Sequence, residues 1–173
     1  MGSQAALRPS SPPKKRARTS ATHRGPSLDE ERLKRLLGYN LSRADIRLRK
    51  AFNHHMAHLQ LRPVEFSVLV LIASNPRINQ KELGKVLDIS PPNVAVLLDR
   101  LSERGLIERV RSSLDRRNQH LHLKPSGKVL VAQAEDVART MEDAVLSVLS
   151  DGQRALLTEL LQKLAQVPLD WAE

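Results

Sequence analysis

Cysteine is absent from this chain of 173 residues. Without cysteine the protein can form no disulfide bond, no thiolate metal site and no thiol-based redox sensor. The longest apolar run, residues 68–73, is far shorter than the roughly 18 residues of a membrane-spanning helix. The N-terminus also lacks the apolar core of a secretory signal. We therefore expect a cytoplasmic protein that makes no membrane contact.

Aromatic residues are also scarce, and the four present are dispersed: Tyr39, Phe52, Phe66 and Trp171. Such a set does not build a platform on which single-stranded DNA or RNA bases stack. The chain also lacks a glycine-rich phosphate loop, a zinc-protease helix and a nucleophile elbow. We therefore predict neither an enzyme nor a bound cofactor.

Acidic residues are missing from residues 1–27, which hold six basic residues and so supply +6 of the net charge of +9. Four prolines, five serines and almost no hydrophobic periodicity predict a disordered basic tail here. Either this tail is solvated and uninvolved, or it adds non-specific attraction to phosphates. The run 12–18 would also pass as a nuclear import signal, although nothing else in the chain looks eukaryotic.

Helical periodicity begins after the tail. Ser27 and Glu30 have the spacing of a capping box, so order is expected to begin at Ser27. Within the first helical region, apolar residues at steps of three and four over 41–59 predict one apolar face of a long helix. Gly38, which comes before this stretch, is expected to break the helical region into two pieces.

Further helices are predicted over 63–74 and from 79 or 80 to 87, the first with a proline in its first turn. Ser90 is a strong N-cap for the next helix, and Pro91 suits its first position because the missing N–H costs nothing there. Gly105 supplies the stop of that helix.

Two short strands follow, over 106–111 and 119–123, joined by turn-forming residues that include Asp115 and Asn118. Pro125 opens another long helix. The last amphipathic helix carries Leu156, Leu157, Leu160, Leu161 and Leu164. These terminal helices are more apolar than the lobe between them needs, so we expect a two-fold partner to cover them.

Taken together, these segments resemble the MarR family of transcriptional regulators, over about residues 39–165. The resemblance lies in the order and spacing of 83–87 (LGKVL), 94–108 (VAVLLDRLSERGLIE), 115–117 (DRR) and 123–127 (LKPSG). It implies a mainly α fold with a small β-wing, in which a winged helix-turn-helix lobe is joined to a helical dimerisation region.

The domains then follow as a disordered basic tail over 1–27, an N-terminal dimerisation and effector region over 28–61, a DNA-binding lobe over 62–124 and C-terminal dimerisation helices over 125–173. The resemblance implies a recognition helix over 90–104. A homodimer would place two such helices in successive major grooves of a pseudo-palindromic operator.

The resemblance also implies a wing over 111–120 whose aspartate orients its arginines while one arginine, for which we favour Arg117, enters the minor groove. The predicted DNA-binding residues are Ser90, Pro91, Pro92, Asn93, Val96, Arg100, Arg111, Asp115, Arg116 and Arg117. Many relatives carry threonine or serine at the position of Asn93, so its partner is open: adenine by bidentate pairing, or only phosphate or water. Arg100 is expected to contact phosphate.

Family members often bind small anionic aromatic compounds, which makes Arg43 and His55 candidate effector residues. His55 lies on the apolar stripe and could equally be an ordinary core histidine. His54 and His58 share one helical face, as a zinc-binding pair would, but no acid stands nearby in sequence, so we expect a solvated face and no metal site. His120 and His122 share a face of the second strand, where a solvated flank is expected.

The sequence therefore predicts a sequence-specific, double-stranded DNA-binding regulator in the cytoplasm, associated with the nucleoid. Its expected form is a homodimeric repressor that a small aromatic acid releases. Two alternatives stay open: a winged-helix module that binds proteins, and a regulator that responds to metal.

Overall fold

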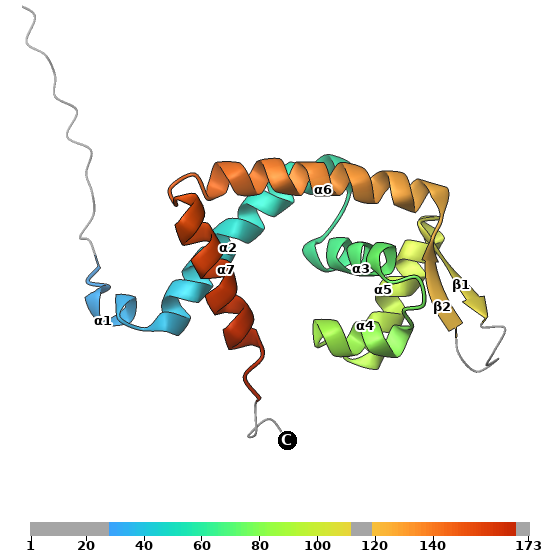
Figure 1. Ribbon diagram of the computed structural model, residues 1–173, viewed down its shortest axis with the longest axis horizontal. Coiled ribbons are helices and arrows are strands. Elements are labelled where there is room, and N and C mark those ends of the chain that lie inside the picture. Colours follow the sequence, from blue (N-terminus) through green and yellow to red (C-terminus); the bar gives the residue numbers. More distant parts are fainter. Residues whose placement is uncertain (1–27, 112–118, 169–173) are drawn as a thin grey trace, which may run out of the picture.

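The computed structural model describes residues 28–111 and 119–168. In chain order its elements are α1 (Glu31–Lys34), α2 (Leu37–Met56), the 3₁₀ turn η1 (Ala57–Leu59), α3 (Pro63–Ser74), α4 (Gln80–Leu87), α5 (Pro91–Glu103), β1 (Ile107–Arg111), β2 (Gln119–Leu123), α6 (Pro125–Val145) and α7 (Asp151–Ala165). A lobe made of α3, α4, α5 and the two strands lies under one end of α6, whereas α1 and α7 lie toward its other end (Figure 1). The predicted mainly α fold with a small β-wing is confirmed.

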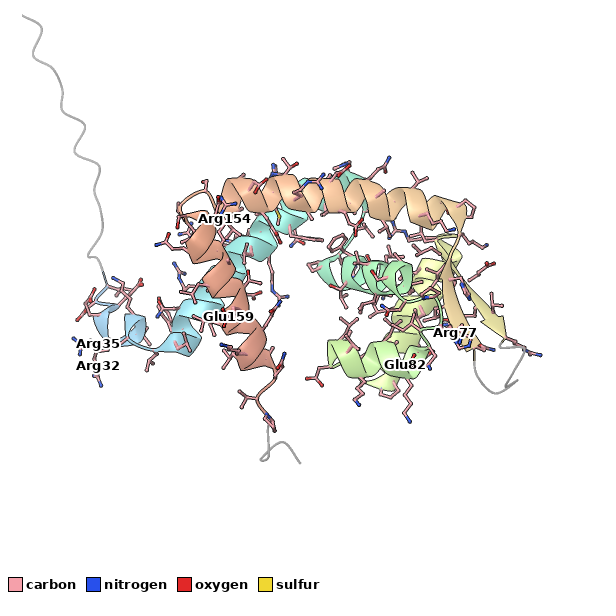
Figure 2. The ribbon with its side chains drawn as sticks, in the orientation of Figure 1. Arg32, Arg35, Arg77, Glu82, Arg154 and Glu159 are labelled. Carbon is pink, nitrogen blue, oxygen red and sulfur yellow. The ribbon has the colours of Figure 1, made fainter. Side chains whose placement is uncertain are left out.

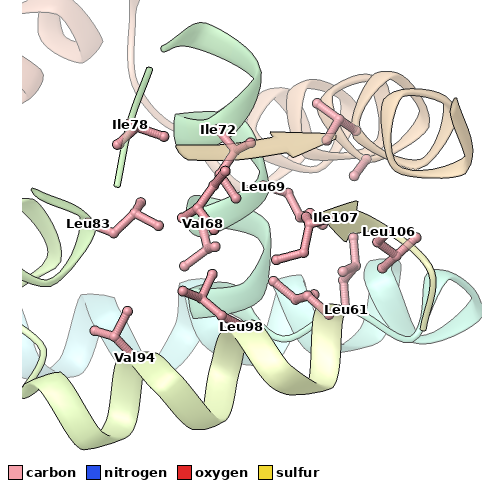
Figure 3. Packing of buried hydrophobic residues seen from close by; sticks show 14 of the residues in the cluster. Leu61, Val68, Leu69, Ile72, Ile78, Leu83, Val94, Leu98, Leu106 and Ile107 are labelled. Atoms are coloured by element: carbon pink, nitrogen blue, oxygen red, sulfur yellow. The ribbon is translucent and has the colours of Figure 1, made fainter. Parts of the chain in front are cut away.

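The core of the lobe lies where α3, α4, α5 and β1 meet (Figure 3). Leu69, Leu83, Leu98 and Ile107, one from each element, are almost completely buried. A fully buried side chain of this size contributes roughly 1.5–3 kcal/mol. The buried side of α5 is formed by Val94, Leu98 and Leu101, and Leu97 next to them is half-buried.

The predicted strands form an antiparallel pair whose register runs from Ile107 opposite Leu123 to Arg111 opposite Gln119. The α3–α4 loop also joins this ribbon, because the Leu121 amide donates to the Ile78 carbonyl (2.9 Å). The base of the wing is therefore fixed to the helix-turn-helix lobe.

Four of the predicted helix starts are confirmed, each with a proline or a polar cap. Pro63 and Pro125 open α3 and α6. Asn79 caps α4 in a reciprocal box, in which its side chain accepts from the Glu82 amide and Glu82 accepts from the Asn79 amide, both at 3.0 Å. Ser90 occupies the N-cap position of α5, but its side chain makes no capping hydrogen bond.

The first helical region is divided into two helices, as predicted, but not at Gly38. The break lies at Leu36, whose backbone is extended (φ −92°, ψ 124°), and Gly38 lies inside α2. The side-chain amide of Asn40 donates to the carbonyls of Lys34 (2.8 Å) and Leu36 (2.9 Å), which stabilises the break.

The predicted capping box of Ser27 and Glu30 falls partly outside the described residues. Ser27 lies outside the described residues, and α1 begins only at Glu31, whose amide donates to Asp29 Oδ1 (2.9 Å). Glu30 accepts a hydrogen bond from the Tyr39 hydroxyl (2.9 Å), and this bond raises the pKa of Tyr39.

α7 is attached at its start and otherwise buries no residue. The Arg154 guanidinium donates to the Leu146 carbonyl and to Asp143, both at 3.1 Å, next to the α6–α7 turn (Figure 2). Ser150 and Gln153 form a capping box at the same place. The five leucines of this helix are 41–54% exposed.

No single helix among residues 28–111 and 119–168 is long and apolar enough to cross a membrane. The segments Leu37–Leu59 and Pro63–Ser74 are together long and apolar enough by length and composition only, and the pair is bent by 69° at the break between them.

Candidate nucleic-acid interface

The start of α5 is nearly free of unused backbone donors. Pro91 and Pro92 have no N–H, and the first helical bond runs from the Val94 amide to the Ser90 carbonyl (3.1 Å). Asn93 therefore carries the one N–H of this first turn that has no helical acceptor. The hydroxyl of Ser90, which makes no capping bond, lies exposed beside it.

The outer face of α5 is open to solvent over its whole length. All six predicted residues of this helix are exposed: Ser90, Pro91, Pro92, Asn93, Val96 and Arg100. Val96 is 50% exposed, and an apolar side chain in this position suits contact with a thymine methyl group. The thirteen residues of α5 span about 20 Å, which fits a major groove.

Neighbouring elements hold α5 in place at its beginning and its middle. Gly84 of α4 approaches so closely that an added Cβ would lie 3.0 Å from the Ile89 carbonyl oxygen and 3.3 Å from Val94. Further along, Asp99 pairs with Arg109 of β1 at 2.7 Å. These contacts fix α5 to α4 and to the base of the wing.

The end of α5 is fixed by Arg104, which the sequence reasoning missed. Its guanidinium donates to the carbonyls of Gln60 (2.9 Å) and Leu59 (3.3 Å) and lies 3.8 Å from Glu65. Glu65 is 5% exposed and also accepts from the Arg62 amide (3.0 Å). We call Arg104, Glu65 and the carbonyls of Gln60 and Leu59 the Arg104 clamp. This clamp joins the end of α5 to the α2–α3 junction.

A signal for the clamp exists in the sequence. Glu65 is the one charged residue in the otherwise apolar helix α3. A buried acid normally requires a partner, but its spacing to Arg104 follows no local rule.

Arg100, expected to contact phosphate, lies next to this clamp. It lines a hollow of about 310 Å³ with Gln60, Arg62, Glu65, Glu103 and Arg104. Three arginines and two glutamates line that hollow, so its formal charge is +1.

The structure describes the base of the wing. Arg111 is exposed at the end of β1, while the predicted tip residues Asp115, Arg116 and Arg117 lie outside the described residues. His120 and His122, expected to form a solvated flank, are both half-buried. His120 donates from Nδ1 to the Arg77 carbonyl (2.6 Å), and His122 lines a hollow of about 320 Å³ beside α6.

The two predicted effector residues lie in separate hollows. His55 lines one of about 300 Å³ between α2 and α6, with His58, Asp136, Val137 and Thr140. Its Nδ1 donates to the Ala51 carbonyl (2.8 Å), which leaves Nε2 free to accept a hydrogen bond. Arg43 lines a smaller hollow of about 160 Å³ with Ile46, Arg47 and Lys50.

A metal site is not indicated. In the part of the chain that the structure describes, no three histidine, aspartate or glutamate side chains lie close enough together to hold an ion. His54 packs edge-on against His55, with ring centroids 5.2 Å apart.

The exposed helix α5, the ribbon that follows it and the α4–α5 turn define a winged helix-turn-helix protein. The sequence profile of the MarR family matches residues 61–118. A putative transcriptional regulatory protein for the hcr operon of Thauera aromatica is 30% identical over 129 residues, covering 74% of this chain and 78% of the relative. The chain belongs to the MarR family of transcriptional regulators.

Solved structures agree with this assignment. The transcriptional repressor CouR bound to a 23-mer DNA duplex has a TM-score of 0.78 and 39% identity, covering 81% of this chain and 99% of that one. CouR bound to p-coumaroyl-CoA has a TM-score of 0.73 and 37% identity over the same shares.

Proposed function

We propose that this regulator is a homodimeric repressor without enzymatic activity, which binds a pseudo-palindromic DNA duplex and leaves it when an aromatic acid or its CoA thioester binds. The observation that carries the proposal is the open outer face of α5, with Asn93, Val96 and Arg100, next to the strand β1 that carries Arg109 and Arg111. The similarity to CouR, a repressor described on a DNA duplex, supports it.

DNA recognition in this proposal combines two kinds of contact. The outer face of α5 reads base edges in the major groove, with Asn93 placed to pair with adenine. Ser90 and Arg100 bind phosphates at the edges of that groove. Arg111 and the tip residues Asp115, Arg116 and Arg117 follow the backbone, with Arg117 entering the minor groove.

Dimerisation is supported by the apolar surface that the single chain leaves open. α7 buries nothing, and α1 also contains no buried residue. Leu36 and Leu37, at the start of α2, are 56% and 65% exposed. A second copy related by a two-fold axis would cover these faces and present two α5 helices on one side of the dimer.

The hollow that contains His55 supports the ligand step. It lies between α2 and α6, which connect the open ends of the molecule to the DNA-binding lobe (Figure 1). A ligand wedged there would change the angle of the lobe and so the spacing of the two recognition helices. A tenfold loss of DNA affinity requires only about 1.4 kcal/mol of coupling.

The decisive experiment is fluorescence anisotropy on a labelled duplex from the region upstream of this gene, compared with a scrambled duplex at about 0.15 M salt. We expect preferential binding that an aromatic acid or an aromatic acyl-CoA relieves. Equal binding to both duplexes, after neighbouring intergenic duplexes have also been tried, would contradict sequence-specific recognition. Preferential binding that no aromatic compound relieves would contradict the ligand step alone.

A further inference from the structure

One face of α2 and η1 carries a continuous row of basic and imidazole side chains. They are Arg43, Arg47, Lys50, His54 and His58, at steps of four, three, four and four, and all five are exposed. Residues at these steps lie on one face of a helix. The opposite face of α2, which includes Phe52, packs toward α6. We call the first three residues of the row, Arg43, Arg47 and Lys50, the basic stripe.

The charges of the basic stripe are not balanced inside the described chain. None of its three residues forms an ion pair there. Arg49, on another face of the same helix, does pair with Asp45 at 2.8 Å. The stripe therefore presents three cations with a small hollow between them, where a polyanion could bind.

The row ends at the hollow lined by His55. His58 belongs to both, and along the helix axis Arg43 and His55 are about 18 Å apart. A ligand that used both hollows would have to be long, anionic at one end and compact at the other.

The hollow at His55 also contains an acid, Asp136, which pairs with Arg139. A free aromatic carboxylate would bring a second negative charge next to it. A thioester is neutral at the same atoms and brings no second negative charge next to Asp136. The hollow therefore suits an esterified acid better than a free one.

We propose that the basic stripe is a phosphate subsite for the nucleotide part of an aromatic acyl-CoA, whose acyl end occupies the hollow at His55. This inference rests on the proposed function, in which a ligand releases the repressor from DNA. It identifies that ligand as the CoA thioester and not the free acid. The diphosphate and ribose phosphate of CoA match the stripe, since arginine forks bind phosphate oxygens in pairs. The flexible, uncharged arm of CoA would follow the row past His54.

The test is calorimetric titration of the full-length protein with p-coumaroyl-CoA, benzoyl-CoA, CoA and p-coumarate. We expect a thioester to bind more tightly than p-coumarate. The triple variant Arg43→Gln, Arg47→Gln, Lys50→Gln should weaken thioester and CoA binding at least about tenfold. It should leave the affinity for p-coumarate unchanged. The matched control Arg49→Gln removes a charge from another face of α2 and should change neither.

Equal thioester affinity in the wild type and the triple variant would overturn the subsite, as would the failure of every CoA compound to bind the wild type. An effect of Arg49→Gln as large as that of the triple variant would also overturn the subsite, because it would show that overall charge determines binding.

Anisotropy measurements of operator binding by the same proteins separate the two proposals. If p-coumarate releases the operator and the triple variant changes nothing, the proposed function stands and the subsite fails. If no operator preference exists but the triple variant loses CoA binding, the subsite stands and the proposed function fails.

Discussion

Gly127 lies where the first turn of α6 meets the start of β1, and the contact leaves no room for a side chain. A Cβ built on Gly127 would lie 2.1 Å from the carbonyl oxygen of Leu106. The same carbonyl accepts from the Lys124 amide (2.9 Å), and the Ser126 hydroxyl donates to the Gly105 carbonyl (2.7 Å). The segment 123–127, one of those that resemble the family, therefore holds the wing base against α6.

We expect Gly127→Ala to lower the free energy of unfolding by about 1–3 kcal/mol, because the backbone of Leu106 would have to shift. Urea denaturation followed by circular dichroism measures this. Gly152→Ala is the matched control: nothing lies within 4 Å of its built Cβ, so it should be neutral or stabilising by up to about 1 kcal/mol. Equal effects of both substitutions would contradict the close approach.

At the wing, the corresponding prediction concerns Arg117. Arg117→Ala should weaken operator binding by about 1–3 kcal/mol and leave the dimer intact, since a minor-groove contact carries little of the folding energy. Anisotropy on the operator and sedimentation measure the two effects. Arg49→Ala, on α2, removes an equal charge far from α5 and should have no effect on DNA affinity. Unchanged operator affinity in Arg117→Ala would refute the wing assignment.

Among the elements, those that begin with a strong local signal could be predicted from the sequence. Pro63, Asn79 and Pro125 each mark a start that the structure reproduces. The position of the break before α2 could not be predicted, because it depends on the Asn40 side-chain amide, which donates to two backbone carbonyls. The low helix propensity of glycine pointed to Gly38 instead.

For the site, the residues on the exposed face of α5 could be named from the sequence, because the family resemblance implies a recognition helix over 90–104. The Arg104 clamp did not, because it joins residues 39 and more positions apart, as in the bond from Arg104 to the Gln60 carbonyl across 44 positions. Only the folded lobe brings them together. The separation of Arg43 and His55 into two hollows was missed for a related reason: a shared helix does not imply a shared cavity.

The Arg104 clamp predicts how the attachment of α5 affects stability and DNA binding. Arg104→Gln should destabilise the lobe by about 1–3 kcal/mol, because two carbonyl bonds are lost and Glu65 is left buried without its cation. Operator affinity should fall as well, since the end of α5 is no longer fixed. Thermal unfolding and anisotropy measure these changes. Arg49→Gln removes an exposed pair and should cost less than about 1 kcal/mol, so equal losses would contradict a special role for the clamp.

The exposed apolar face of α7 leads to a prediction about dimerisation. Leu161→Glu should shift the protein toward monomers, because a charge would be buried in the proposed dimer surface. Sedimentation velocity across a concentration series measures the shift. Gln162→Glu adds the same carboxylate at the next position and should leave the dimer unchanged. A dimer that tolerates both substitutions would show that α7 is not at the interface.

For the whole molecule, the folded part and the tail contribute differently to the charge. Residues 28–173 carry 22 basic and 19 acidic residues, so their excess is only +3, against +6 for residues 1–27. The specific recognition that we propose for α5 and the wing therefore does not depend on a large overall positive charge. The tail can add affinity for any duplex without adding information about sequence.

Removing residues 1–27 should therefore lower the affinity for operator and scrambled duplexes alike and preserve the preference between them. Each phosphate contact contributes about 0.9 to the slope of log affinity against log salt, so the slope should decrease by up to about 5 if all six cations bind. Anisotropy between about 0.05 and 0.2 M salt measures both quantities. A tail of the same length with its six basic residues changed to glutamine is the matched control and should behave like the truncation. If the truncated protein lost its operator preference while still folded and dimeric, the tail would be part of the reading surface. An unchanged slope would mean that the tail is solvated and uninvolved even when DNA is bound.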